Sequence, residues 1–232
     1  MKGESLLSLV PMRAEPSDKA EMVNQILYGE TFEIIDNQEK WNKIRLDHDG
    51  YEGWIDNKQW QVTNSEKMLR KPLNKLMLLN KNSRPQQIFS MGSLILERKS
   101  LVTSKKILPT ALQFLGVPYL WGGRSFMGID CSGFTQVVFR VSGKTILRDA
   151  NQQAGQGKSV AFNKAKEGDL AFFKNDMGRV VHVGIIFKEN EKLKIIHASG
   201  KVRIDLLDEK GIFNEETKTY THTFHSIKRI RR

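Results

Sequence analysis

The residue with the most evident chemistry is Cys131, the single cysteine of the 232-residue chain. It lies in residues 128–133, Gly-Ile-Asp-Cys-Ser-Gly, immediately before a predicted helix. The thiolate is the nucleophilic form of cysteine, and the positive end of a helix lowers the pKa of a thiol placed there. The alternative is a buried cysteine that behaves as a small apolar side chain. Because the flanking Asp, Ser and Gly residues are poor core neighbours, we expect Cys131 to be a nucleophile.

Two histidines lie in predicted strands from which they could serve this thiol. His182 belongs to an apolar run over 180–187, and strand alternation turns it away from the valines on either side of it. The neighbouring Gly184 leaves room for another element to approach. His197 lies in a similar strand over 193–199, from which it could fix the tautomer and orientation of His182. We interpret the remaining histidines as structural residues; they are His48, His222 and His225.

The elements that must position these residues follow in the second half of the chain. Apolar residues at helical spacing predict a helix from Ile107 to Leu115, which Gly116-Val117-Pro118 stops. A second, amphipathic helix follows Cys131. Strands are predicted over 169–174, 181–188, 192–199, 201–207 and 223–230. Helices followed by consecutive strands indicate an α+β domain with an antiparallel sheet.

The front of the chain has a different pattern. Short strands are predicted over 31–36, 41–47 and 51–55, the last after the tight turn at Asp49-Gly50. Their spacing resembles a bacterial SH3-like barrel. Residues 63–101 fit no periodic template and are punctuated by Asn and Pro. We therefore predict an SH3-like domain over 1–62, a basic linker or wrapping segment over 63–101, and a catalytic domain over 102–232.

Composition and charge limit the function classes. Hydrophobic residues make up 39% and charged residues 27%, a folded composition, and no apolar run approaches the ~20 residues that span a bilayer. The net charge of +11 is uneven: residues 1–62 carry 7 basic and 12 acidic side chains, whereas 63–102 carry 8 and 2. No RNA-binding signature, zinc finger or repeated basic stripe is present. We expect neither a nucleic acid nor a membrane as partner.

A single cysteine excludes an intrachain disulfide and multi-cysteine metal frameworks. The apolar stretch Leu6–Val10 is shorter than the core of a secretory signal, and Pro11 ends it. We expect a cytoplasmic protein, or a secreted one if a signal was removed before residue 1.

Five motifs of the second half resemble, in order, those of the NlpC-type cell-wall cysteine peptidases. They are Pro118–Gly123, Gly128–Phe134, Gly168–Leu170, His182–Ile185 and Ile196–Ala198. The front, with Glu21-Met22-Val23 and Asp49–Trp54, is similar to the SH3-like domain of the subfamily that cuts murein peptides between D-glutamate and the diamino acid. The resemblance implies an α+β, papain-like peptidase domain, with helices packed on an antiparallel sheet, preceded by a small SH3-like β-barrel.

The resemblance also implies roles for individual residues. Cys131 would be the nucleophile, His182 the base and His197 the orienting third residue, while Tyr119 would help the oxyanion hole together with the Cys131 backbone N–H. Asp130 and Ser132 would line the D-glutamate site. A free substrate amino terminus would be held by three residues, Glu21, Tyr51 and Asp149. For Glu21 a solvated surface charge, and for Tyr51 simple packing in the barrel, are the alternatives. No metal and no cofactor are expected.

The implied substrate is a small murein peptide, L-Ala-γ-D-Glu-diamino acid, with a free N-terminal L-alanine, cleaved in peptidoglycan recycling. A basic catalytic domain suits its carboxylates, and an acidic front suits its ammonium group. One alternative is a secreted hydrolase that uses the SH3-like domain to anchor itself to intact cell wall. Another is a zinc site of Cys131, His182 and His197, which lacks the usual close-spaced ligand pair. The diamino acid, the preference for tri- or tetrapeptides and the oligomeric state stay open.

Overall fold

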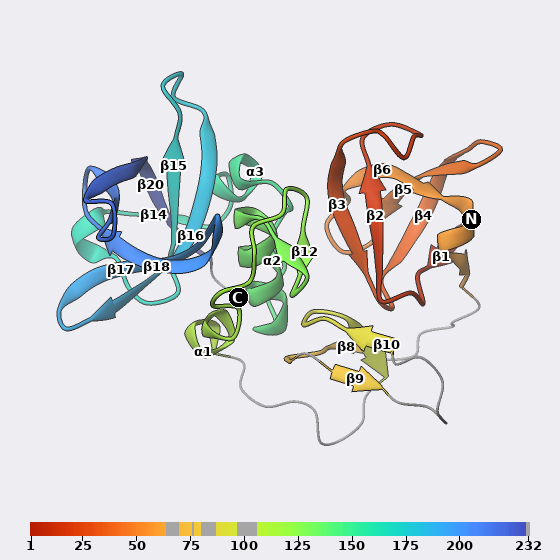
Figure 1. Cartoon of the computed structure of the whole chain (residues 1–232), viewed down its shortest axis with the longest axis horizontal. Coiled ribbons are helices and arrows are strands. Elements are labelled where there is room, and N and C mark those ends of the chain that lie inside the picture. Colours follow the sequence, from red (N-terminus) through yellow and green to blue (C-terminus); the bar gives the residue numbers. More distant parts are fainter. Residues whose placement is uncertain (64–69, 76, 80–86, 97–105, 231–232) are drawn as a thin grey trace. The chain divides into compact units, whose positions relative to one another are not determined.

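The computed structural model describes residues 1–63, 70–75, 77–79, 87–96 and 106–230 (Figure 1). The chain forms two compact units. One contains Met1–Ser104 and Leu120–Gly128, and the other contains Lys105–Tyr119 and Ile129–Arg232. Residues 120–128, which lie inside the range predicted for the catalytic domain, therefore group with the N-terminal unit. The chain passes from one unit to the other at three points.

The N-terminal unit is built on a seven-stranded antiparallel sheet that is rolled into a small barrel (Figure 1). Its strands follow the order β3-β2-β6-β5-β4-β1-β7. Their bounds are β1 (Lys2–Glu4), β2 (Leu9–Arg13), β3 (Met22–Leu27), β4 (Thr31–Asn37), β5 (Trp41–Leu46), β6 (Glu52–Asp56) and β7 (Gln61–Val62), with a 3-10 turn at Asn57–Gln59.

Period-two alternation explains why these residues form strands. In β5, Asn42, Ile44 and Leu46 are buried, whereas the residues between them are not. The core of the barrel contains Val10, Met12, Ile26, Phe32, Ile44, Leu46 and Ile55. The strands predicted over 31–36, 41–47 and 51–55 are present with bounds shifted by at most one residue, while β2 and β3 lacked an alternation clear enough to predict.

Between 63 and 101 the described residues form two short antiparallel pairs. These are β8 (Arg70–Pro72) with β11 (Leu94–Leu96), and β9 (Met77–Leu79) with β10 (Gln87–Phe89). Each strand has three residues, too few to carry a readable period. The Leu94 N–H donates to the Tyr28 carbonyl oxygen at 2.7 Å. A Cβ at Gly29, where φ is +79°, would lie 2.2 Å from the Leu94 carbonyl oxygen, so only glycine fits there.

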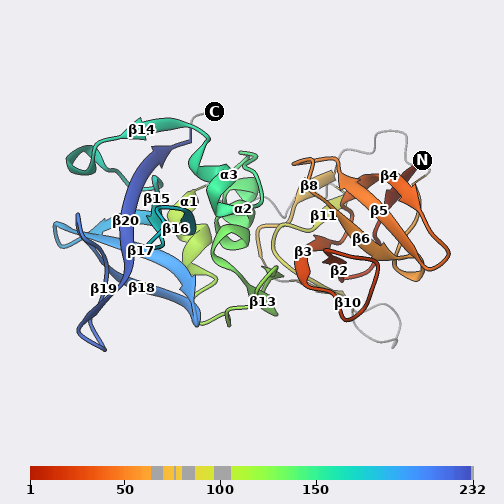
Figure 2. The same cartoon turned by 90° about the horizontal axis from the view of Figure 1, so that it is seen from above.

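The C-terminal unit is built on a second seven-stranded antiparallel sheet, in the order β14-β20-β15-β16-β17-β18-β19 (Figure 2). Its bounds are β14 (Lys158–Val160), β15 (Leu170–Lys174), β16 (Val180–Glu189), β17 (Lys192–Ser199), β18 (Lys201–Leu207), β19 (Gly211–Asn214) and β20 (Thr219–Arg229), with a 3-10 turn at Phe162–Lys164. Since β20 pairs with β19 as well as with β14 and β15, the sheet closes on itself.

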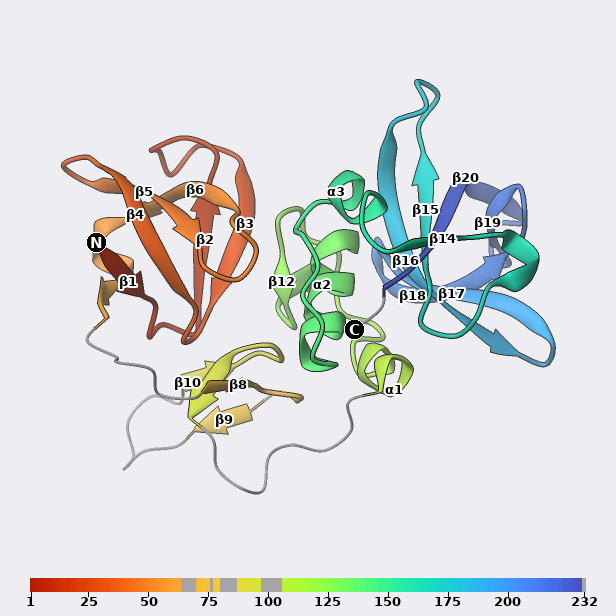
Figure 3. The ribbon, with the colours of Figure 1, turned by 180° about the vertical axis from the view of Figure 1, so that it is seen from behind.

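Three helices lie on one side of this sheet (Figure 3), and each contacts β16. They are α1 (Ile107–Leu112), α2 (Cys131–Val141) and α3 (Ala150–Ala154). The sequence of α2 is amphipathic, as predicted, and its polar face is covered as well: every residue from Cys131 to Phe139 is buried, because α1, α3 and two strands all pack on it. The first helix ends at Leu112, earlier than predicted, and Leu115 is 46% exposed.

Two further strands of two residues each, β12 (Arg124–Ser125) and β13 (Gly128–Ile129), lie in or next to residues 120–128. No helix in the described part of the chain is long and apolar enough to cross a membrane.

Candidate active site

The thiol of Cys131 lies in the first turn of α2. The N-cap of this helix is Asp130, whose carboxylate accepts a hydrogen bond from the Gly133 N–H at 2.7 Å. This bond fixes the point at which the helix begins. Cys131 is 7% exposed and forms no disulfide. Its sulfur has backbone hydrogen bonds with Ser132 and with Val183, the residue after His182. The packing of α2 on β16 therefore brings the thiol to the strand that carries the predicted base.

Burial changes the ionisation that we expected for this thiol. The helix N-terminus was expected to lower its pKa, but burial, and next the charge of Asp130, raise the pKa of Cys131 to about 12. The hydrogen bonds with Val183 and Ser132 act in the opposite direction without outweighing burial. In this state the thiol is protonated at neutral pH, so the thiolate must form by proton transfer to a nearby base.

His182 and His197 form a buried, hydrogen-bonded pair. Nε2 of His182 lies 2.8 Å from Nδ1 of His197, and the side chains are 5% and 1% exposed. Burial, followed by the neighbouring His197 and His222, lowers the pKa of His182 well below its ordinary value. Burial also lowers the pKa of His197, against the opposing effect of Asp205. Both rings are neutral at pH 7 and can each donate one N–H and accept one.

Gly184 makes the histidine pair possible. A Cβ at this position would lie 2.7 Å from Ile195 side-chain carbons and 2.8 Å from Cβ of His197. The two strands could not lie this close together if the residue at position 184 had a side chain. The room predicted from the glycine beside His182 is thus filled by the strand that carries His197.

The structure extends the pair by two residues that the sequence did not reveal. Nε2 of His197 lies 2.9 Å from Oδ2 of Asp205, a carboxylate 5% exposed. Arg203 donates from Nε to Oδ2 of that carboxylate at 2.8 Å and from Nη2 to Oδ1 at 2.9 Å. The hairpin around Gly200 was the sequence signal that could have revealed them. In its register His197 pairs with Arg203, and Asp205, two residues further along the strand, is therefore a diagonal neighbour of His197.

His222 also belongs to this cluster. We interpreted it as a structural residue and did not connect it with the site, but its ring stacks on that of His182 with centroids 4.0 Å apart and 25° between the planes. Phe173 packs against both rings, at centroid distances of 5.9 and 6.1 Å. Burial lowers the pKa of His222 to about 4. A neutral ring at this position restrains the plane of His182 without adding a positive charge.

Tyr119 lies near the start of the helix that carries the thiol. Its N–H donates to the Gly200 carbonyl oxygen at 2.9 Å, and the residue forms a bridge with Ile129. Burial, and next the charge of Cys131, raise the pKa of Tyr119 to about 12, so the phenol keeps its proton and can donate a hydrogen bond. This is the property that a contributor to an oxyanion hole requires.

Asp130 and Ser132 are tied to a buried arginine, Arg148, which the sequence did not single out. Arg148 donates from both terminal nitrogens to the Asp130 carboxylate, at 3.0 and 2.5 Å, and to Oγ of Ser132 at 2.9 Å. The three side chains are 2–6% exposed. This network holds the beginning of α2, and hence Cys131, in place.

The remaining predicted residues have contacts of their own. Asp149 begins α3, where it forms a capping box with Gln152. In the N-terminal unit, Tyr51 is half-buried and packs against the barrel core. Glu21 is exposed, and its carboxylate accepts a hydrogen bond from the indole of Trp121.

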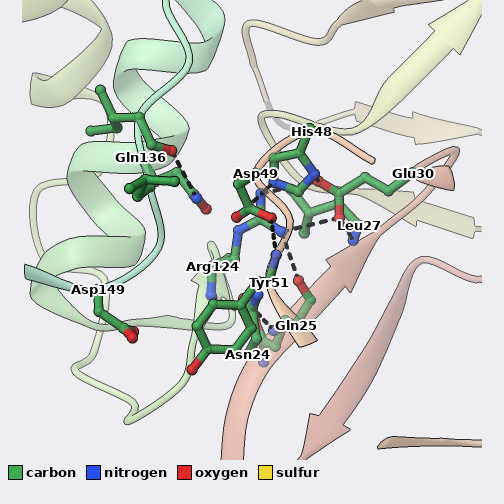
Figure 4. Close-up of polar contacts among 12 residues, drawn as sticks. Asn24, Gln25, Leu27, Glu30, His48, Asp49, Tyr51, Arg124, Gln136 and Asp149 are labelled. Carbon is green, nitrogen blue, oxygen red and sulfur yellow. Dashed lines mark hydrogen bonds and ion pairs between the residues drawn. The ribbon is translucent and has the colours of Figure 1, made fainter. Parts of the chain in front are cut away.

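The N-terminal unit also contains a buried ion pair that fixes residues 120–128 (Figure 4). Arg124, which is fully buried, donates to both carboxylate oxygens of Glu30 at 3.0 Å and to the Gln25 carbonyl oxygen at 2.8 Å. His48 lies 3.3 Å from Arg124 and 3.2 Å from Asp49. Among the described residues, no group of three or more His, Cys, Asp or Glu side chains is arranged to hold a metal ion.

Comparison with known protein families matches both units. The sequence profile of the NlpC/P60 family matches residues 116–221, and that of the bacterial dipeptidyl-peptidase Sh3 domain matches residues 12–59. Cys131, His182 and His197 thus lie inside the first match, and the second covers most of the barrel.

Two curated relatives and one solved structure extend this similarity. A gamma-D-glutamyl-L-lysine dipeptidyl-peptidase of Bacillus subtilis is 32% identical over 69% of this chain and 68% of its own length. A protein of the same name from Bacillus cereus is 36% identical over 47% of this chain, but only over 33% of its own length. The crystal structure of an NlpC/P60 family protein from Bacillus cereus has a TM-score of 0.81 at 20% identity and covers 99% of both chains, which shows a shared fold.

Proposed function

We propose a substrate and a mechanism from the premise that this chain belongs to the NlpC/P60 family and is a cysteine peptidase of that family, with an SH3-like domain in front of a papain-like one. The resemblance read from its motifs is thereby confirmed. The proposed reaction is hydrolysis of the γ-D-glutamyl-diamino acid bond of murein stem peptides. The observation that supports it is the buried His182–His197 pair, which lies in the same compact unit as Cys131 and next to Val183, the residue whose backbone is hydrogen-bonded to the thiol.

The proposed mechanism is acyl transfer in two steps. Cys131 gives its proton to His182 and attacks the γ-D-glutamyl carbonyl carbon, while His197 holds the orientation of His182. The protonated His182 then donates to the amine of the departing diamino acid. A water molecule that loses its proton to His182 releases the acyl group and restores the thiol. The Tyr119 hydroxyl and the Cys131 backbone N–H would stabilise the oxyanion.

The finer specificity follows from the resemblance together with the charges. We propose that Glu21, Tyr51 and Asp149 recognise a free N-terminal L-alanine, that Asp130 and Ser132 lie by the D-glutamate, and that the enzyme recycles released peptides in the cytoplasm. The relatives named above are described as dipeptidyl-peptidases, a name that suits release of a dipeptide from a free amino terminus.

Replacement of the nucleophile and base tests the reaction. Cys131→Ala and His182→Ala should each reduce cleavage of L-Ala-γ-D-Glu-diaminopimelate or its lysine counterpart at least 10³-fold, because neither step can proceed without them. Product release is measured by mass spectrometry, and circular dichroism checks that the variants fold. Wild-type rates in either variant would refute the assignment.

Acetylation of the substrate tests the specificity. The free tripeptide and its N-acetyl form should differ at least tenfold in kcat/KM, since acetylation removes the ammonium charge. Glu21→Gln should raise KM for the free peptide only. Equal rates for the two peptides, together with cleavage of intact sacculi, would instead support a cell-wall hydrolase.

A further inference from the structure

The base of this site works only in one of its tautomers. Nε2 of His182 is engaged by His197, so Nδ1 is the nitrogen left to take the proton of Cys131. A neutral imidazole carries one proton, on either nitrogen. If the proton sits on Nδ1, His182 cannot act as a base. Some feature of the structure must therefore keep the proton of His182 on Nε2.

The hydrogen-bond chain that leads away from His182 supplies this feature. An ionised carboxylate only accepts hydrogen bonds, so Asp205 requires the proton of His197 to sit on Nε2, 2.9 Å from Oδ2. Nδ1 of the neutral His197 must then accept. Its partner at 2.8 Å, Nε2 of His182, must accordingly donate. The lone pair of His182 is left on Nδ1.

Arg203 keeps the carboxylate in its acceptor form. Its guanidinium binds both oxygens, and its side chain is 18% exposed. Burial by itself would raise the pKa of Asp205, but the hydrogen bonds from His197 and Arg203 outweigh it and lower the pKa. Arg203 also lies 3.3 Å from the exposed Glu216.

We propose that Asp205, held by Arg203, is a positioning residue that sets the tautomers of His197 and His182 and so leaves the catalytic base ready for the thiol. The inference rests on the proposed function only in taking His182 as the base of Cys131. Asp205 acts through His197, with no contact to the thiol required. In other nucleophile–base–orienter sites, a carboxylate that holds the base in the correct tautomer contributes about 10⁴-fold to kcat.

Other charged or titratable groups around His182 do not supply this polarity. They are Cys131 and Asp130 from the α2 region and His222 from β20. His222 stacks on the face of the ring, so its nitrogens do not meet the ring nitrogens of His182 edge-on. Asp130 is engaged by Arg148 and by the start of α2.

Asp205→Asn is the informative substitution because it preserves shape and alters polarity. An amide has one accepting oxygen and one donating NH₂ group, whereas Arg203 and His197 donate hydrogen bonds to both oxygen positions of the Asp205 side chain. If the NH₂ group turns toward His197, the chain reverses: His197 donates from Nδ1, His182 accepts at Nε2, and the proton of His182 blocks Nδ1. In either orientation the NH₂ group faces a donor of Arg203, since Nε lies at the position of Oδ2 and Nη2 at that of Oδ1, so the pair with Arg203 is weakened.

The first measurement reads the tautomers directly, without substrate. Two-bond ¹H–¹⁵N NMR spectra of the full chain labelled at histidine distinguish protonated from unprotonated ring nitrogens. In the wild type at pH 7.5, His182 and His197 should both carry their protons on Nε2. In Asp205→Asn, a measurable fraction should carry them on Nδ1. Asp208→Asn, the same change at a residue bound to Tyr220 on the neighbouring loop, should give the wild-type spectrum.

The second measurement is turnover of the murein tripeptide. We expect kcat of Asp205→Asn to fall by about 10–1000-fold with KM changed less than threefold, Arg203→Lys to lie between it and the wild type, and Asp208→Asn to stay within twofold. A wild-type proton on Nδ1 of His182, or Asp205→Asn with unchanged tautomers and kcat, would overturn the inference. The wild-type spectrum tests the inference even if the variant fails to fold. Absence of turnover in the wild type would refute the proposed function and leave the tautomer result standing.

Discussion

At the scale of single residues, the proposed site combines a protonated thiol, the proposed nucleophile, with a neutral histidine, the proposed base. Burial raises the pKa of Cys131 and lowers that of His182, so both shifts favour the uncharged pair over a thiolate–imidazolium pair. Removing water from both groups also strengthens every later electrostatic interaction with the reacting carbonyl. In the proposed mechanism, proton transfer is thus coupled to attack, which makes the tautomer of His182 decisive.

The reactivity of the single cysteine tests this description. Because the pKa of Cys131 is about 12, alkylation by iodoacetamide at pH 7 should be at least tenfold slower than that of the urea-unfolded chain, and its rate should still rise above pH 9. Mass spectrometry of the intact protein gives the rate without ambiguity, since no other thiol exists. A rate that reaches its plateau below pH 7 would show a thiolate stabilised by His182 instead.

At the scale of elements, the site depends on how closely β16 and β17 approach. His182 and His197 come from these two strands, and Gly184 is the position at which the strands leave no space for a side chain. The same pair of strands and α2 also bring Val183 to the thiol. A small outward shift of β17 would therefore separate His197 from His182 while the fold persisted.

Gly184→Ala should produce that shift. The new methyl group would meet Ile195 and His197 at under 3 Å, and we expect a loss of about 1–3 kcal/mol in the free energy of unfolding together with at least a tenfold loss of kcat. Urea unfolding followed by circular dichroism measures the first effect. Val181→Ala, three residues earlier on the same strand and 51% exposed, is the matched control and should change stability by less than about 0.5 kcal/mol. Wild-type turnover in Gly184→Ala would show that the close approach is unnecessary.

At the scale of the whole molecule, the N-terminal unit includes a segment that comes from the second half of the chain. Residues 120–128 belong by their contacts to the N-terminal unit, yet they run directly between Tyr119 and Ile129 of the other unit. The ion pair of Arg124 with Glu30 holds this segment in the N-terminal unit, and both side chains are fully buried. Loss of one partner leaves the other charge buried and unpaired, which costs far more than loss of an exposed pair.

Arg124→Ala should destabilise the N-terminal unit by about 3–5 kcal/mol. Arg45→Ala removes the partner of Glu52 in an exposed pair of the same barrel and should cost less than about 1 kcal/mol. Tryptophan fluorescence during urea unfolding reports on this unit alone, because Trp41, Trp54, Trp60 and Trp121 all belong to it and the chain has 4 tryptophans. Similar losses for the two variants would contradict the importance of the buried pair.

The sequence by itself determined the chemistry and the architecture. The motifs around Cys131, His182 and His197 are local, and so are the alternation and turn signals that predict most of the strands. Each of these features depends only on residues that are neighbours in the sequence. They were sufficient to identify the family and to predict the papain-like and SH3-like folds. The three-residue strands between 63 and 101 carried too few residues to show a period.

Only the tertiary structure decided which polar residues complete the site. Asp205, Arg203 and His222 come from β18 and β20, and their contacts with the histidine pair depend on strand register and on ring stacking, which a sequence does not state. The ionisation of Cys131 was decided in the same way. A helix N-terminus is visible in the sequence and lowers a thiol's pKa, but the opposing desolvation depends on everything packed around the sulfur, and here burial is the larger effect.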